Sequence, residues 1–188
     1  MQMGKKIGLT LSLIVILTFL VGCKSSDYQN ATELMESGQY EDAQIEYAAL
    51  GDYKDSSERA TMLQIKVIME EYREFYENMD TLTIVNYNNV MSPLLSIVEE
   101  VDKLDYEKIA EYPELEEYVS DIQTVNEGIR QLVELDRDSI SQFLGDDFYM
   151  FPSTMQLSIQ QSDSLVRSWL QMLLDMEFPY ENILQDGN

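Results

Sequence analysis

The sequence lacks several residue types on which enzymes and binding sites commonly depend. Its 188 residues include no histidine and one cysteine, and 12 Lys and Arg stand against 35 Asp and Glu. Without histidine, the commonest general base and the commonest transition-metal ligand are excluded. A single cysteine excludes an internal disulfide and a zinc–thiolate site. Because no glycine-rich phosphate loop occurs either, the sequence predicts neither an enzyme activity nor a cofactor.

The shortage of positive charge also excludes a class of partner. The formal net charge is −23 at pH 7, and the phosphates of a nucleic acid repel so acidic a chain, so we expect no binding to nucleic acid. Adjacent carboxylates such as Glu99-Glu100 are interpreted as solvated helix faces rather than acid–base pairs. Asp146-Asp147 would offer oxygen ligands to Ca²⁺, but the alternating ligands of an EF-hand loop are missing, and the pair fits the end of a helix better.

One uncharged apolar run, at residues 7–21, follows Lys5 and Lys6. A helix of this length covers about 22 Å, less than the roughly 30 Å hydrocarbon core of a bilayer, so the run favours a cleaved signal peptide over a permanent transmembrane helix. It ends in Leu20-Val21-Gly22-Cys23, which resembles the lipobox of bacterial lipoproteins. The resemblance implies that Cys23 receives a diacylglycerol group, that the chain is cut before Cys23, and that the new amino group gains a further acyl chain such as palmitate.

We therefore expect a signal peptide at residues 1–22, and a lipidated cysteine with a short tether at residues 23–27. Two or more acyl chains give stable anchoring where one chain gives only marginal binding. The mature chain would thus be lipid-anchored to the cell membrane and face the extracytoplasmic side. Lipidation also gives the lone thiol of an exported chain a chemical role.

Helix-favouring composition and three-and-four spacing of apolar residues predict an all-α fold. No glycine occurs between Gly51 and Gly128, and the chain has only four prolines. We expect one helical domain over residues 28–176 and a flexible tail at 177–188. Within the domain, a helical hairpin at residues 28–58 precedes an antiparallel bundle of long amphipathic helices at residues 59–176.

The hairpin is expected to consist of helices at 27–37 and 40–50, ended by Gly38 and Gly51. The second helix carries a small residue among aromatic and aliphatic ones, at Tyr40, Ala43, Tyr47 and Leu50. This pattern resembles the turn and second helix of a tetratricopeptide repeat. No second copy follows at Glu74–Glu77, about one period further on, so the pattern predicts an isolated unit without an extended concave groove.

In the bundle, a capping box at Asp55 begins a helix that runs to about Met79. We expect a loop or irregular piece at residues 80–91 and a new helix over 92–111, with Ser92 as N-cap and Pro93 as its first residue. The last predicted helices span residues 113–144 and 154–176. The final helix is amphipathic, with an apolar set at Leu165, Val166, Trp169, Leu170, Leu173 and Met176.

The strongest periodic signal lies in the helix at 113–144. Its apolar residues follow three-and-four steps that resemble a coiled-coil seam, interrupted at Asp136. The seam consists of Leu115, Tyr118, Ile122, Val125, Ile129 and Leu132. The helices at 55–79 and 92–111 are the expected partners within the chain, although the pattern equally allows pairing with a second copy.

Two stretches are candidate interaction surfaces. Tyr87 and Asn88 belong to an Asn-rich stretch whose polar side chains suit a peptide or glycan, and a plain loop is the alternative. Phe148, Tyr149 and Phe151 either bury their loop on the end of the bundle or form a patch for another protein, since aromatic residues are favoured at protein interfaces.

These features favour a membrane-anchored helical lipoprotein that acts as a protein-interaction or scaffold module at the bacterial cell surface. Its expected partners are membrane lipid, through acylated Cys23, and an unidentified protein. The alternative is an extracytoplasmic lipoprotein that binds a peptide or glycan for a transporter, although such receptors usually alternate strands and helices. An enzyme that uses paired carboxylates is a third hypothesis, which no group of residues specifically supports.

Overall fold

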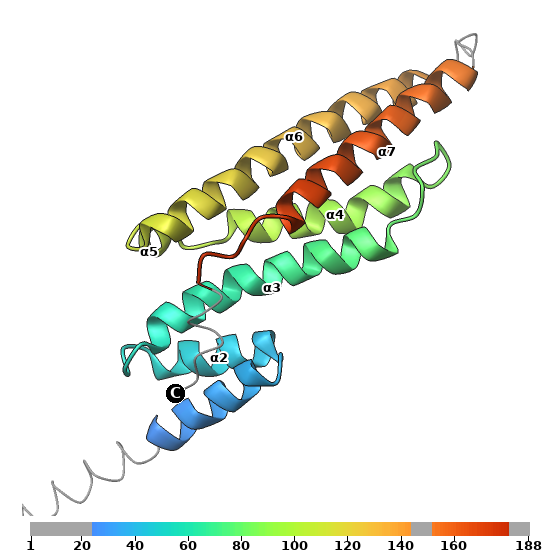
Figure 1. Ribbon diagram of the computed structural model, residues 1–188. Coiled ribbons are helices and arrows are strands. Elements are labelled where there is room, and N and C mark those ends of the chain that lie inside the picture. Colours follow the sequence, from blue (N-terminus) through green and yellow to red (C-terminus); the bar gives the residue numbers. More distant parts are fainter. Residues whose placement is uncertain (1–23, 144–151, 181–188) are drawn as a thin grey trace, which may run out of the picture. The chain divides into compact units, whose positions relative to one another are not determined.

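The computed structural model describes residues 24–143 and 152–180, and every regular element among them is a helix. The fold is therefore all-α, as the sequence predicts (Figure 1). A helical segment at residues 24–36 comes first. The elements that follow are α2 (Tyr40–Leu50), α3 (Ser56–Asn78), α4 (Tyr87–Asp102), α5 (Tyr106–Ile109), α6 (Pro113–Phe143) and α7 (Pro152–Leu174). They form two compact units that divide within α3, where unit 1 ends at Gln64 and unit 2 covers Ile65–Pro179.

Unit 1 contains the predicted helical hairpin, and its two glycines end the helices as expected. Gly38 has a φ of +79°. Its N–H donates to Met35 O at 3.0 Å and the next N–H, of Gln39, donates to Leu34 O at 2.9 Å. This pair of bonds is the Schellman motif, which needs a left-handed residue that glycine adopts without strain. In α2, Ala43 and Tyr47 are fully buried.

The expected tether at residues 23–27 is not an extended segment where the structure describes it. Residues 24–27 already belong to the first helix. Two side-chain bonds hold this turn: Lys24 Nζ donates to Leu50 O at 3.4 Å, and the Tyr28 hydroxyl donates to Asp55 at 2.6 Å. The helix therefore follows Cys23 directly.

Helix α4 begins at Tyr87, so the expectation that Ser92-Pro93 starts it is wrong. Thr83 and Asn86 form a reciprocal pair, in which Thr83 N donates to Asn86 Oδ1 at 2.7 Å and Asn86 N donates to Thr83 Oγ1 at 3.2 Å. These bonds close the turn directly before α4, whose N-cap, Asn86, makes no side-chain bond to the first turn of the helix. Pro93 lies inside the helix, where the carbonyl of exposed Asn89 loses a helical bond to it and can bond to water instead.

The expected helix at residues 92–111 is also interrupted before its end. Helix α4 ends at Asp102, and the short helix α5 begins at Tyr106. Asp105 separates them as the N-cap of α5, because its side chain accepts a bond from Lys108 N at 3.1 Å. The acceptor favours a new helix start over continuation of the old helix.

Unit 2 is a bundle in which the seam of α6 is buried within the chain. Leu115, Ile122 and Ile129 are at most 1 % exposed. The main partner of α6 is α7, which runs antiparallel beside it (Figure 1) and which the sequence did not indicate. Helices α4 and α5 also pack against α6. The question of whether this seam pairs within or between chains is therefore answered by packing within the chain.

The interior side of α6 carries two polar residues that bond to tyrosines of other helices. Asn126 accepts a bond from the Tyr72 hydroxyl of α3 at 2.6 Å, and Asp136 accepts one from the Tyr87 hydroxyl of α4 at 2.9 Å. Both acceptors are buried, at 1 % and 4 % exposure. Because a buried polar group is costly unless it is bonded, these pairs favour one register of the helices over others.

Candidate functional site

Helix α7 exposes no charged residue where its side chains are described. Its only charged residues, Asp163 and Arg167, are half-buried and form an ion pair at 3.1 Å. The pair is also tied to the loop before α4, since Arg167 donates to Met79 O at 2.9 Å and Leu82 N donates to Asp163 at 2.9 Å. The exposed residues are Leu157, Gln160, Gln161, Ser164, Leu165, Ser168, Gln171 and Met172. In a chain with a net charge of −23, such a surface is unusual.

Three of these exposed residues are large and apolar. Leu157, Leu165 and Met172 are 57 %, 44 % and 51 % exposed. At 3.6 residues per turn they lie within about 80° of one another around the helix axis, so they form one stripe. Leu165, which the sequence placed in the apolar set of this helix, therefore belongs to an outward stripe rather than to the core.

Helix α6 has a matching uncharged stripe that adjoins α7 at one residue, Gly128. Its members follow three-and-four spacing, at Thr124, Gly128, Gln131, Leu135 and Ser139. Leu135 is 66 % exposed. The stripe meets that of α7 at Gly128, because a Cβ atom on this glycine would lie 3.3 Å from the Trp169 ring. On α7, Leu165 and Met172 flank Trp169 at positions i−4 and i+3, and on α6, Thr124 and Gln131 flank Gly128 in the same way.

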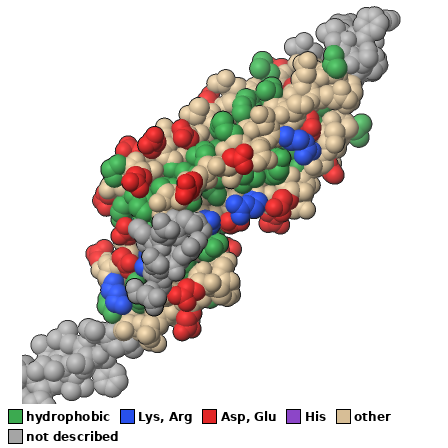
Figure 2. Space-filling model, in the orientation of Figure 1, with side chains coloured by type: hydrophobic (Ala, Val, Ile, Leu, Met, Phe, Trp, Pro, Cys, Tyr) green, Lys and Arg blue, Asp and Glu red, His purple; other side chains and the backbone are tan. Residues whose placement is uncertain are grey.

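We call the combined surface the α6–α7 face. It consists of Thr124, Gly128, Gln131, Leu135 and Ser139 of α6 with Leu157, Gln161, Leu165, Ser168, Trp169 and Met172 of α7. In the space-filling view, hydrophobic side chains run along this pair of helices, and acidic side chains gather toward the α5 end of α6 (Figure 2).

The three polar side chains that α6 contributes to the α6–α7 face are bonded within that helix. The hydroxyls of Thr124 and Ser139 donate to the carbonyls of Ser120 and Leu135, at 3.0 and 2.8 Å. Gln131 Nε2 donates to Glu127 at 2.7 Å. Burying donors that are already bonded leaves fewer of them unsatisfied, which lowers the cost of covering the face.

An acidic hollow lies at one end of this face. It has a volume of about 330 Å³ and is lined by Glu114, Glu117, Tyr118, Asp121, Met176, Glu177 and Pro179. Its carboxylates are exposed, and no group of three or more potential metal ligands in the described ranges is arranged to hold a metal ion. Asp146-Asp147, the other candidate for Ca²⁺, lies outside the described residues.

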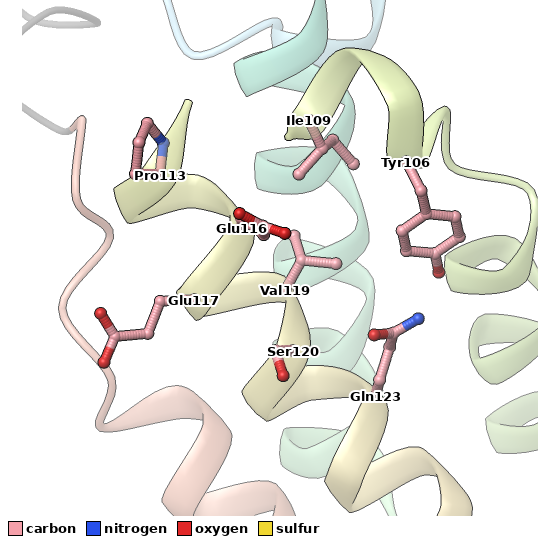
Figure 3. A pocket seen from close by; sticks show the side chains of 8 residues that line it. All are labelled: Tyr106, Ile109, Pro113, Glu116, Glu117, Val119, Ser120 and Gln123. Atoms are coloured by element: carbon pink, nitrogen blue, oxygen red, sulfur yellow. The ribbon is translucent and has the colours of Figure 1, made fainter. Parts of the chain in front are cut away.

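A second hollow, of about 390 Å³, lies between α5 and α6. Ile109 and Val119 are buried beneath it, whereas Glu116, Glu117 and Gln123 are exposed at its edge. Figure 3 shows Glu117 turned away from Tyr106, and Gln123 on the same side as the Tyr106 hydroxyl. This hydroxyl donates to Val101 O at 2.5 Å. The carboxylates at its edge are exposed, and an apolar floor with a few polar groups at the edge is typical of binding pockets.

The most strongly bonded charged group in unit 1 is Asp55. It accepts bonds from the Tyr28 hydroxyl at 2.6 Å and from Arg59 Nε at 2.9 Å. Burial works against ionisation of Asp55, but these bonds outweigh it and lower the pKa of the carboxyl. Burial, followed by the bond to Asp55, raises the pKa of Tyr28 to about 12. Lys54 Nζ lies 3.9 Å from the centre of the Tyr28 ring, so the group forms a closed structural cluster.

The structure places only two of the predicted site residues. Tyr87 is 1 % exposed and bonded to Asp136, so its assignment to an interaction surface is wrong. Burial, and then the charge of Asp136, raises the pKa of Tyr87. Asn88, the next residue, is exposed. Cys23, Leu20, Val21 and Gly22 lie outside the described residues, and so do Phe148, Tyr149 and Phe151.

The α6–α7 face was missed because its signal is an absence of charged residues rather than the presence of a motif. Between Pro152 and Leu174 only Asp163 and Arg167 are charged, although a quarter of the whole chain is charged. That local absence is the signal that would have found the surface. Its second stripe, on α6, depends on which side of α6 meets α7 and is visible only in the fold.

In comparisons with known proteins, no family model, no curated protein and no solved structure matches this chain. Among the helices of the described segments, none is long and apolar enough to cross a membrane.

Proposed function

We propose that this chain is a lipid-anchored helical lipoprotein of the bacterial cell envelope, and that its α6–α7 face binds another polypeptide. The anchor is proposed from Leu20-Val21-Gly22-Cys23, which resembles a lipobox. The interaction is proposed from the α6–α7 face, which is the single observation that carries it. Leu135, Leu157 and Met172 are exposed there, and contiguous apolar surface of this kind marks contact sites.

Lipidation is tested on the full chain expressed in a bacterium. Mass spectrometry of the mature N-terminus should find diacylglycerol on Cys23, and the protein should fractionate with membranes. Cys23→Ala should leave the chain unprocessed or release it from the membrane, whereas Ser25→Ala should behave as the wild type. An unmodified Cys23 in membrane-associated protein would refute the anchor.

The interaction is tested by placing a photo-crosslinking amino acid at single positions in intact cells. At Met172, which is 51 % exposed in the α6–α7 face, it should form an adduct with another polypeptide. At Glu74, an exposed residue of α3, it should form far less. Equal yields at both positions would mean that the α6–α7 face is not the binding surface.

The alternative, a ligand receptor for a transporter, has less support. The two hollows of unit 2 have volumes of about 390 and 330 Å³, at the small end of the range for ligand sites. Both are lined by exposed carboxylates. The described residues contain no strand, which differs from the alternating architecture expected of such receptors.

A further inference from the structure

We propose that the partner of the α6–α7 face is a second copy of this chain, paired antiparallel with its own α6–α7 face. The inference rests on the proposed function, because it names the polypeptide that the proposed surface binds. It depends on three observations: the sign of the charge on the exposed helices, the absence of charge from one face, and the position of the acidic residues at one end of that face.

The exposed surface outside the α6–α7 face is strongly acidic. Helix α6 exposes Glu116 and Glu134 away from the face, and Glu127 and Asp138 at its edge, where Glu127 accepts a bond from Gln131 at 2.7 Å. Helix α3 exposes Glu71, Glu74 and Glu77, and α4 exposes Glu99, Glu100 and Asp102. A basic partner would gain from any of these surfaces and would have no need of an uncharged one.

An acidic partner, in contrast, is repelled by these acidic surfaces. Carboxylates brought face to face repel each other, and an unpaired carboxylate that is covered is costly to desolvate. Only an uncharged surface lets two acidic molecules touch without these costs. A second copy is acidic by identity and carries the same uncharged surface, so two copies meet in the isologous arrangement of a two-fold dimer.

The acidic end of the face favours the antiparallel arrangement. Glu114, Glu117 and Asp121 precede the uncharged stripe of α6, and Glu177 lies with them. Parallel pairing would place these carboxylates opposite their counterparts in the other copy. Antiparallel pairing places them at opposite ends of the dimer, with the two-fold axis near Gln131 and Ser168.

The size of the face indicates a weak dimer. From Thr124 to Ser139 the stripe extends about 22 Å along α6, and neighbouring helices lie about 8–10 Å apart. Such an area is at the low end for specific protein contacts. Anchoring both copies in one membrane raises their effective concentration, so weak pairing is sufficient there.

The pairing is tested by disulfide crosslinking of the full chain in its membrane. Ser168→Cys places a thiol near the two-fold axis, and Ser96→Cys is its matched control, since both serines are exposed on helices of unit 2. The wild type, which retains Cys23, gives the background. After mild oxidation, Ser168→Cys should yield about tenfold more dimer than Ser96→Cys, which corresponds to about 1.4 kcal/mol. Two differently tagged copies, expressed together, should both be found in the dimer band.

Charge is then added to the face without a change of size. In the Ser168→Cys background, Gln161→Glu should reduce the dimer several-fold. Gln123→Glu, at an exposed position of α6 outside the face, should leave the yield unchanged. Equal yields for both charge variants would overturn the proposed surface, and so would equal dimer from Ser168→Cys and Ser96→Cys.

The outcomes separate this inference from the proposed function on which it rests. A lipidated Cys23 with adducts from Met172 to a different protein, and no Ser168→Cys dimer, overturns self-pairing and leaves the proposed function standing. An unlipidated Cys23 with a strong Ser168→Cys dimer refutes the anchor and supports the pairing.

Discussion

Helices α6 and α7 pack against each other, but their exposed residues differ in charge. Outside the α6–α7 face, α6 exposes mainly carboxylates, whereas α7 exposes only Gln, Ser, Leu and Met where its side chains are described. The buried sides of the two helices also differ in polarity. Helix α6 buries Asn126 and Asp136 beside its apolar seam, while the buried side of α7 is apolar except for Ser162.

The two helices therefore differ in the chemistry that their exposed sides present. The acidic surface of α6 repels like-charged molecules, and its buried polar pairs favour one register of the bundle. Helix α7 contributes apolar packing on one side and a surface free of charge on the other. The net charge of −23 does not indicate the uncharged surface of α7, because composition averages over the whole chain.

The largest effect on the free energy of unfolding is expected for a buried residue of α6, and an exposed residue of α7 serves as its comparison. Ile129→Ala should lower the free energy of unfolding by about 2–5 kcal/mol, because Ile129 is fully buried and the substitution leaves a cavity. Leu165→Ala should change it by less than about 0.5 kcal/mol. Denaturant unfolding of the purified chain measures both, and a large loss for Leu165→Ala would mean that this side chain is not on the surface.

The next effect concerns the two buried polar pairs of α6. Tyr87→Phe leaves the carboxylate of Asp136 without its donor and should cost about 1.5–3 kcal/mol, whereas Tyr72→Phe removes a bond to a neutral amide and should cost about 0.5–1.5 kcal/mol. Both hydroxyls are removed by the same chemical change, so each variant is the control of the other. The same unfolding measurement applies, and the reverse order would contradict the assignment of a charged acceptor to Tyr87.

A smaller effect is expected where the two helices touch most closely. Gly128→Ala gains up to about 1 kcal/mol of helix propensity, but the added Cβ would lie 3.3 Å from Trp169. The two terms oppose each other, so the free energy of unfolding should change by less than about 1 kcal/mol. The fluorescence of Trp169, the only tryptophan, should shift, because its ring must move. An unchanged spectrum with a full gain in stability would show that the ring does not contact Gly128.

The smallest effect belongs to Tyr28 in unit 1, which serves as a reference outside the α6–α7 pair. Its pKa is raised from 10.0 to about 12 in the folded state, so the folded chain holds this proton more tightly than the unfolded chain. The resulting stability is fully present below pH 10 and is lost as the pH rises from 10 through about 12.

The free energy of unfolding, measured between pH 9 and 12, should therefore fall less steeply with pH for Tyr28→Phe than for the wild type. Absorbance at the tyrosinate wavelength should show one late-ionising group fewer. Tyr40→Phe, at a half-buried position of α2, is the matched control. An identical slope for wild type and Tyr28→Phe would refute the proposed state of this hydroxyl.

Much of the fold could be predicted because its signals are local. Gly38 and Gly51 end their helices and Pro113 begins α6, each through the conformation of a few neighbouring residues. Helix α3 begins at Ser56, directly after Asp55 as expected, although the Asp55 side chain bonds to Tyr28 and Arg59. The start of α4 was missed because its N-cap, Asn86, makes no side-chain cap bond and instead accepts a bond from Thr83 N in the preceding turn. The role of Tyr87 was missed because its partner, Asp136, is 49 residues away.

The sequence by itself determined the all-α class, most helix boundaries, the buried seam of α6 and the acidic character of the chain, since periodicity, capping and charge are properties of short segments. Tertiary structure decided that α7 is the main partner of α6, that Asp136 lies inside, and that two uncharged stripes adjoin at Gly128 and Trp169. The physical reason is that amphipathic helices of similar length can pair in several ways. Which pairing is most stable depends on the fit of side chains far apart in the sequence.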